Sequence, residues 1–167
     1  MKLSDFGSKT PLSLLNLEPA GSHTVYVNDF IKVAADFIEE NYRGLVHISH
    51  SIDSYERVTV SEYHLVRLFK KLVSISGFNK LVNVKFTCDF SNFSIEMSYD
   101  DGERFDRSSE RELIKLARDA GFEARRAGAG LVIYKEVFRS SVISVFTRPA
   151  APSLLKKIFR EVFFEED

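Results

Sequence analysis

The chain has 167 residues, with 23 basic and 24 acidic side chains and a formal net charge of −1 at pH 7. This length is typical of one domain, a hydrophobic fraction of 44% with fifteen Phe excludes a disordered chain, and the balanced charge gives no indication of a nucleic-acid or acidic-membrane partner. The single Cys88 excludes an internal disulfide and a multi-cysteine metal site, and because no apolar run of bilayer length or signal peptide is recognisable, we expect a cytoplasmic protein with no membrane partner.

Residues 1–24 are predicted to form an irregular arm, because prolines and glycines interrupt any regular pattern. Its leucines are expected to dock on this chain or on a second copy. From Asn28, the expected N-cap, the pattern is that of a helix, and Gly44 is its expected C-terminal stop. Apolar residues recur at i, i+3, i+4, i+7 and i+8, which places them on one helix face: Phe30, Val33, Ala34, Phe37 and Ile38.

A strand is predicted at residues 46–52, where apolar and polar residues alternate. The next helix is predicted to begin near Thr59 or Ser61. Thr59 and Glu62 have the spacing of a capping box, and Ser61 is an equally good cap. The apolar stripe of this helix is Leu65, Leu68, Phe69, Leu72 and Val73.

A hairpin is predicted at residues 82–99, because both arms alternate with a clean period of two around a turn at Ser91-Asn92. A third helix is predicted from Ser109 to Ala120, with capping-box spacing between Ser109 and Glu112.

Two or three strands are predicted next, over Phe122 to Arg126, Leu131 to Val137 and Val142 to Thr147, with Gly128-Ala129-Gly130 as the first turn. A last helix follows Pro152. The predicted fold class is α/β (α+β): a two-layer sandwich of a mixed, mostly antiparallel sheet with helices on one face, plus an extra C-terminal helix. The sandwich is assigned to residues 25–149, between the arm at 1–24 and the amphipathic helix at 150–167.

Residues 28–105 resemble the front half of the ATP-binding domain of bacterial sensor histidine kinases, a member of the histidine-kinase-like ATPases (GHKL, Bergerat fold). The order of elements carries the resemblance: NDFIKVAADFIEENYRG as a helix, LVHISHSI as a strand, SEYHLVRLFKKLVSISG as the second helix, and a hairpin that ends in Asp100-Asp101-Gly102. The resemblance implies a sandwich fold, a site for Mg-ATP and a role in signalling.

The residues that hold Mg-ATP in that family are mostly replaced here. Lys71 and Ile75 occupy the positions of two asparagines that face the nucleotide, and neither ligates Mg²⁺, which needs oxygen ligands. Lys71 is able to meet a phosphate, but we expect it to face solvent. Asp100 and Gly102 match the turn whose aspartate binds adenine, whereas Arg104 replaces its second glycine; the alternative is a plain Asp-Gly turn.

Two further parts of the family pattern are missing. Too few residues separate Gly102 from the helix at Ser109 to form the family's lid over the nucleotide. Gly128-Ala129-Gly130-Leu131 has the spacing of its second glycine box, but LVIYKEV is predicted to be a strand and not a helix. The phosphoacceptor signature, a histidine followed by an acidic residue, is found at none of the four histidines, which are His23, His47, His50 and His64.

We therefore expect a degenerate histidine-kinase-like ATPase domain that acts as a non-catalytic protein-binding or regulatory module in bacterial signalling, with no catalytic residue, metal or cofactor. The vestigial nucleotide-binding positions are Asp100, Gly102, Lys71, Ile75 and Arg104. A protein partner is expected.

A second copy of the chain is one candidate partner, with an interface on the last helix at Phe159, Val162, Phe163 and Phe164. Packing of this helix within the chain is the alternative. Two other functions stay open. One is a divergent ATP-binding protein kinase of the sensor-kinase or anti-sigma-factor type, with Mg-ATP as cofactor. The other is a phosphotransfer partner that docks a response regulator.

Overall fold

The computed structural model describes residues 22–50, 56–89, 91–137 and 151–165. The predicted leucines of the arm and the predicted strand Val142 to Thr147 lie outside these residues. In chain order the elements are β1 (Ser22–Tyr26), α2 (Val27–Asn41), β2 (Val46–His50), β3 (Arg57–Ser61), α3 (Glu62–Ile75), β4 (Val82–Cys88), β5 (Asn92–Tyr99), α4 (Arg107–Asp119), β6 (Glu123–Ala127), β7 (Gly130–Glu136) and α6 (Pro152–Phe164).

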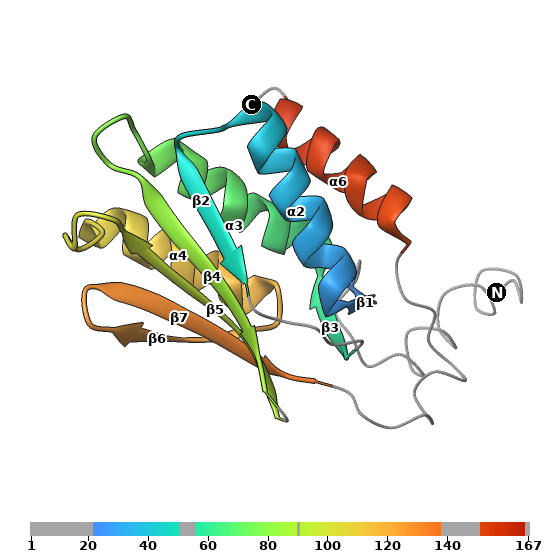
Figure 1. Cartoon of the computed structure of the whole chain (residues 1–167). Helices are drawn as coiled ribbons and strands as arrows, with labels where there is room; N and C mark the ends of the chain where they lie inside the picture. Colours follow the sequence, from blue (N-terminus) through green and yellow to red (C-terminus); the bar gives the residue numbers. More distant parts are fainter. Residues whose placement is uncertain (1–21, 51–55, 90, 138–150, 166–167) are drawn as a thin grey trace, which may run out of the picture.

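The main sheet has five strands in the order β2-β4-β5-β7-β6 (Figure 1). Strand β2 pairs with β4 in parallel, and the other neighbours are antiparallel. The mixed, mostly antiparallel sheet predicted from the sequence is thereby confirmed. The clean alternation of the predicted hairpin fixes the β4–β5 register, in which Val82 is opposite Tyr99 and Cys88 is opposite Phe93.

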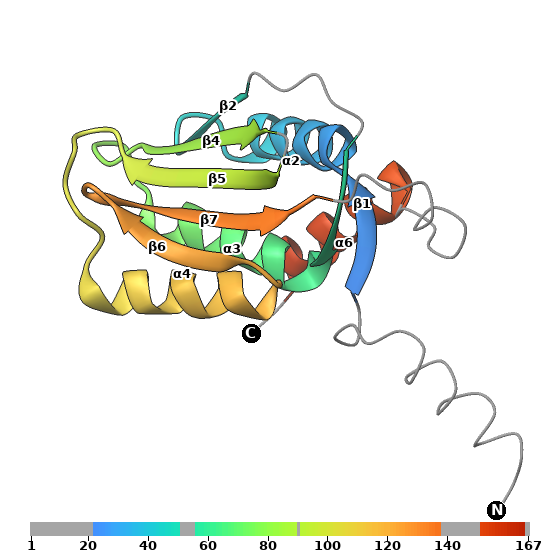
Figure 2. The same cartoon turned by 90° about the horizontal axis from the view of Figure 1, so that it is seen from below.

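The helices lie on one face of this sheet, as predicted. Figure 2 shows α2 beside β4, α4 beside β6, and α3 between the two helices. The apolar stripes predicted for α2 and α3 are the faces that are buried, apart from Val73, which is only partly buried. The alternation of β5 directs one set of side chains toward the helices, and this set is buried: Phe93, Ile95, Met97 and Tyr99.

An aromatic cluster in the core joins α2, α3, β4 and α6. The ring of Phe30 lies 6.0 Å from that of Phe69 and 5.9 Å from that of Phe159, between centroids. Phe86 lies 6.0 Å from Phe69. Each buried aromatic side chain contributes about 2 to 3 kcal/mol through the area it removes from water. The last helix therefore packs within the chain, against the first and second predicted helices.

A second, two-stranded sheet was not predicted. Strand β1 pairs antiparallel with β3, with Ser22 opposite Ser61. Strand β1 begins inside the segment 1–24 that the sequence assigns to an irregular arm, and each of these two strands runs directly into a helix. Thr24 and Thr59 are directly opposite each other and are buried.

The predicted helix caps are mostly wrong. Helix α2 begins at Val27, so Asn28 lies inside it. Thr59 belongs to β3, which excludes its capping box with Glu62, whereas Ser61 is the N-cap residue of α3, although its side chain makes no capping bond.

Helix α4 is capped by Asp106 and not by Ser109. The carboxylate of Asp106 accepts a hydrogen bond from the backbone N–H of Ser109 at 2.8 Å. The hydrogen bonds from Ser109 lower the pKa of Asp106.

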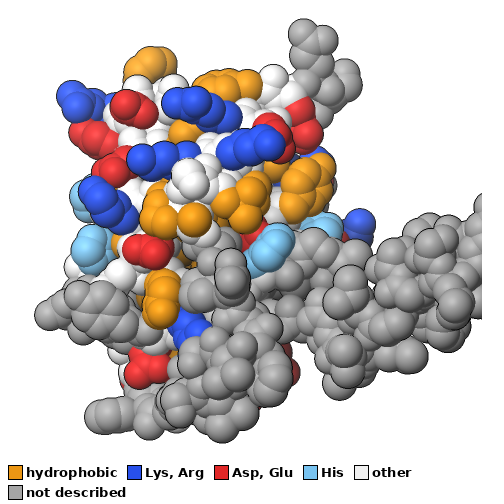
Figure 3. Space-filling model, turned by 90° about the vertical axis from the view of Figure 1, so that its right-hand side faces the viewer, with side chains coloured by type: hydrophobic (Ala, Val, Ile, Leu, Met, Phe, Trp, Pro, Cys, Tyr) orange, Lys and Arg blue, Asp and Glu red, His pale blue; other side chains and the backbone are white. Residues whose placement is uncertain are grey.

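Among the residues that the structure describes, no helix combines the length and the hydrophobicity needed to cross a bilayer. The face seen from the right of Figure 1 carries basic and acidic side chains interspersed with hydrophobic ones (Figure 3). This mixture agrees with the balanced charge of the sequence.

Candidate functional site

The turn that matches the family's adenine-binding motif lies at the end of β5. Gly102 adopts a left-handed conformation, with φ of 81°, which an Asp-Gly turn requires. The exposed Asp100 accepts a hydrogen bond from the side-chain amide of Asn83 at 3.0 Å. Its carboxylate is therefore engaged on the neighbouring strand. Arg104 is exposed on the segment that leads to α4.

The space between this turn and the end of α3 is filled by aromatic side chains. Tyr99 is 8% exposed and Phe105 is 5% exposed, with ring centroids 4.9 Å apart. The hydroxyl of Tyr99 donates a hydrogen bond to the backbone carbonyl of Ile75 at 3.0 Å, so the turn is fastened to the helix. Burial raises the pKa of Tyr99, and the nearby Lys80 ammonium partly offsets this.

Lys80 contacts the turn through the Tyr99 ring and through two carboxylates. Its ammonium lies 4.6 Å from the centroid of the Tyr99 ring, contacts the carboxylate of Glu103, and lies 3.5 Å from that of Asp101. The hydrogen bond to Glu103 raises the pKa of Lys80. Nothing in the sequence pattern singled out Lys80, Tyr99 or Phe105, although strand alternation does predict that Tyr99 points toward the helices.

Lys71 does not face solvent freely, contrary to the expectation from the sequence. Its side chain is 24% exposed, and its ammonium lies 2.9 Å from the carboxylate of Glu112 on α4. Ile75 is partly buried in the core. The five vestigial positions are thus divided between two places: Asp100, Gly102, Ile75 and the exposed Arg104 lie around the filled turn, and Lys71 lies between the helices.

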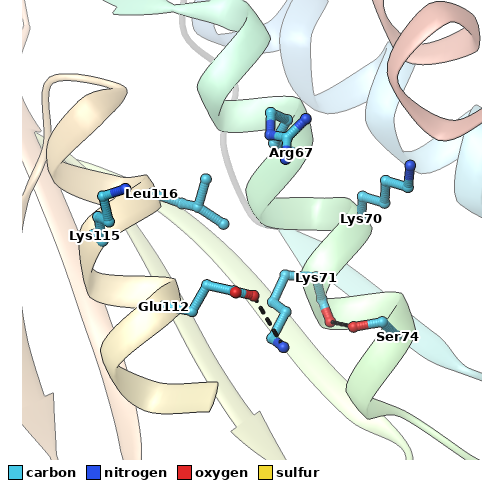
Figure 4. A pocket seen from close by; sticks show the side chains of 7 residues that line it. All are labelled: Arg67, Lys70, Lys71, Ser74, Glu112, Lys115 and Leu116. Carbon is cyan, nitrogen blue, oxygen red and sulfur yellow. Dashed lines mark hydrogen bonds and ion pairs between the residues drawn. The ribbon is translucent and has the colours of Figure 1, made fainter. Parts of the chain in front are cut away.

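The helices α3 and α4 border a groove with a volume of about 370 Å³. Figure 4 shows Lys71 of α3 and Glu112 of α4 pointing toward each other, and Leu116 of α4 pointing toward α3. We name this groove the α3–α4 groove, and it is lined by Arg67, Lys70, Lys71 and Ser74 from α3 and by Glu112, Lys115 and Leu116 from α4. Four of its lining residues are cationic and one is acidic, so the groove favours an anionic ligand.

Sequence reasoning missed Arg67, Lys70 and Lys115 as site residues. The signal was present in part, because Arg67, Lys70, Lys71 and Ser74 recur at i, i+3, i+4 and i+7, which is one face of a helix. The position of α4 beside that face is a tertiary contact that no local pattern records.

The histidines do not form a metal site. His23 contacts the carboxylate of the buried Glu62, and the Nδ1 atom of His64 lies 2.8 Å from the hydroxyl of Ser61. His47 and His50 are both exposed. They lie three positions apart on β2, and because side chains alternate along a strand, they point to opposite faces. The described residues contain no group of three side chains suited to hold a metal ion. Cys88 is half-buried.

Three of the four candidate interface residues on the last helix lie in the core of the chain. Phe159 and Val162 are 0% exposed and Phe163 is 7% exposed, because α6 packs on α2 and α3. These three side chains therefore have no surface to offer a second copy. Phe164, at 57% exposed, does have such a surface, although its ring also contacts Phe37.

No protein-family model and no curated protein matches the chain. The chain is similar to a solved structure of the ATP-binding domain of PrrB from Mycobacterium tuberculosis, with 14% identity and a TM-score of 0.48 over 71% of this chain and 98% of that chain. It is similar to the Acinetobacter baumannii histidine kinase AdeS, with 9% identity and a TM-score of 0.47 over 81% of this chain and 76% of that chain.

The chain is also similar to histidine kinase ThkA in its complex with the response regulator protein TrrA, with 13% identity and a TM-score of 0.48 over 81% of this chain and 47% of that chain. Similarities of this size define neither an activity nor a ligand for this chain.

Proposed function

We propose that this chain is a degenerate histidine-kinase-like ATPase domain that acts as a non-catalytic protein-binding or regulatory module in signalling. The observation that carries the proposal is the filled space beside the Asp100–Gly102 turn. A base bound there has to displace two buried aromatic rings, Tyr99 and Phe105, and has to break the hydrogen bond between Tyr99 and Ile75.

The positions that would hold magnesium support the same proposal. A hard divalent cation needs oxygen ligands, but the two positions on α3 carry an ammonium and an alkyl side chain, those of Lys71 and Ile75. Phosphoryl transfer depends mainly on positioning the triphosphate and on neutralising its charge. A chain with no metal and no bound base would supply neither.

A titration with ATP and with a non-hydrolysable analogue, each with and without Mg²⁺, tests the proposal by isothermal calorimetry. We expect no saturable binding below about 1 mM, which corresponds to an affinity of only ~4 kcal/mol. The filled turn is the reason.

Asp100→Asn is the matched variant for the same titration. Micromolar, Mg-dependent binding that this substitution abolishes would show that Asp100 still binds adenine, and it would contradict the proposal in favour of a divergent ATP-binding kinase.

A further inference from the structure

Three of the four cationic residues of the α3–α4 groove, Arg67, Lys70 and Lys71, lie with Ser74 on one face of α3. Arg67 and Ser74 are separated by about 10 Å along the axis of α3, given a rise of about 1.5 Å per residue. An extended peptide of about three or four residues covers this length. The α3 side of the groove therefore has the length of a short peptide segment, and its charges lie between Arg67 and Lys71.

Carboxylates of the chain itself already occupy parts of this face. The carboxylate of Glu165, just after α6, lies 2.9 Å from the guanidinium of Arg67 and 3.9 Å from the ammonium of Lys70. Glu112 lies 2.9 Å from the ammonium of Lys71. The side chains of the groove are thus placed to accept carboxylates of a polypeptide, because they do so within the chain.

Lys115 adds the fourth cation from the side of α4. It is exposed, and it makes no ion pair with any residue that the structure describes. Leu116, one position further on, gives the groove a partly buried apolar surface. A ligand that offers carboxylates and an apolar side chain has a matching contact for each of these residues.

We infer that the α3–α4 groove docks an acidic segment of a protein partner. This inference rests on the proposed function and specifies the chemistry of the partner. The partner's carboxylates bind Lys115 and Lys71, and the latter binding competes with Glu112. An apolar side chain of the segment packs on Leu116.

A nucleotide fits the same groove less well. None of the seven lining residues is aromatic, so a base finds no ring to stack on, and Asp100 is not among them. The repeated single charges suit separate carboxylates along a chain.

The test is a fluorescence anisotropy titration at low salt with a labelled peptide of about eight residues, with glutamates on both sides of a central leucine, longer than the groove by a few residues. We expect the double variant Lys71→Gln, Lys115→Gln to bind it about five-fold more weakly than the wild type. We expect Glu112→Gln to bind it about two-fold more tightly, because Lys71 is released.

The matched control is the double variant Lys32→Gln, Lys85→Gln, which changes the net charge equally at two exposed lysines outside the groove. We expect wild-type affinity from this variant. If the groove double variant fails to give the urea unfolding curve of the wild type, the single variant Lys115→Gln replaces it, since Lys115 makes no ion pair among the described residues.

Three outcomes overturn the inference: no saturation of the wild type below about 1 mM peptide, equal weakening in the control, or tighter binding of inorganic tripolyphosphate than of the peptide at the same lysines. An ATP titration of the same samples separates the two proposals. Binding of ATP contradicts the proposed function, whereas failure of the peptide without binding of ATP contradicts only the docking site.

Discussion

At the scale of single residues, the hydroxyl of Tyr99 is the atom that fastens the β5 turn to α3. Tyr99→Phe removes the only hydrogen bond from this side chain that the described residues show, and it leaves the carbonyl of Ile75 without its donor. We expect the free energy of unfolding to fall by about 1 kcal/mol, measured by urea denaturation. Tyr42→Phe, at the half-buried Tyr42 just after α2, is the control and is expected to leave the urea midpoint unchanged, because among the described residues the Tyr42 hydroxyl makes no hydrogen bond and its ring packing on Phe37 is kept. Equal curves for Tyr99→Phe and the wild type would show that this bond does not stabilise the fold.

A second residue, Glu62, makes stability depend on pH. Its side chain is 1% exposed, its Oε1 atom has no hydrogen-bond partner among the described residues, and burial raises its pKa above the ordinary 4.5, with the adjacent His23 partly offsetting the shift. Between 4.5 and the raised pKa the folded state binds more protons than the unfolded state. The contribution of Glu62 to the free energy of unfolding therefore falls as pH rises through this window.

Glu62→Gln removes that contribution. We expect the stability of the variant relative to the wild type to increase with pH from about 4.5 upward. Urea denaturation at a series of pH values measures the difference. Glu39→Gln, at an exposed acid paired with Arg43, is the control and should show no such rise. A relative stability that is flat or decreases across the window would contradict the assignment.

Residue patterns predicted which side chains are buried better than they predicted helix caps. The apolar stripe of α2 was predicted correctly because it follows from the helical period alone. The cap of α4 depends on whether the chain turns at Asp106 or at Ser109, and both residues are good caps. In the structure the helix starts from Asp106, the residue directly after Phe105, whose ring packs on Tyr99.

At the scale of elements, β7 approaches β5 closely where it begins. A Cβ atom added at Gly130 would lie 2.3 Å from the carbonyl oxygen of Met97 and 2.9 Å from the Cβ atom of Ser98. The glycine is thus required by strand packing and not by an approach to phosphate. We expect Gly130→Ala to lower the free energy of unfolding by about 3 kcal/mol.

Gly77→Ala is the matched control for this substitution, because its added Cβ would meet nothing within 4 Å. It is expected to change the stability by no more than about 0.5 kcal/mol. Urea denaturation of both variants measures the contrast. Similar stabilities for the two would mean that β7 shifts away from β5 without cost.

The elements that the sequence failed to predict are β1 and β3. Each is short and pairs with a segment far along the chain, as Ser22 pairs with Ser61. Thr59 and Ser61 also fit the start of a helix, and α3 does begin at the next residue, so the local signal favoured the wrong boundary. The hairpin was predicted correctly because its pairing is local and its alternation is unbroken.

At the scale of the whole molecule, α6 closes the core, and Phe159 is its central contact. Its ring is fully buried against Phe30, Phe37 and Phe69. We expect Phe159→Ala to lower the free energy of unfolding by about 4 kcal/mol through the cavity that it leaves. Phe164→Ala, on the same helix but 57% exposed, should cost no more than about 1 kcal/mol. A small effect of Phe159→Ala in calorimetry or urea denaturation would contradict the packing of α6.

The architecture of the whole molecule was predictable, but the site was predictable only in part. The order of helices and strands and their periods restrict the fold to a sandwich of this type. The sequence itself shows Lys71 and Ile75 at the two positions where the resemblance implies magnesium-binding asparagines. The filled turn and the α3–α4 groove depend on Tyr99 reaching Ile75 and on Glu112 reaching Lys71, contacts between segments far apart in the chain.

The contact between Phe30 and Phe159 joins the first described helix to the last one. Helix α2 is synthesised before α6, so the part of its aromatic face that Phe159 covers, at Phe30 and Phe37, lacks this contact on the nascent chain. Until Phe159 has left the ribosome, this part of the face is an exposed hydrophobic surface of the kind that chaperones bind. The exposed part of this aromatic face is therefore buried only after α6 has been translated and has packed on α2.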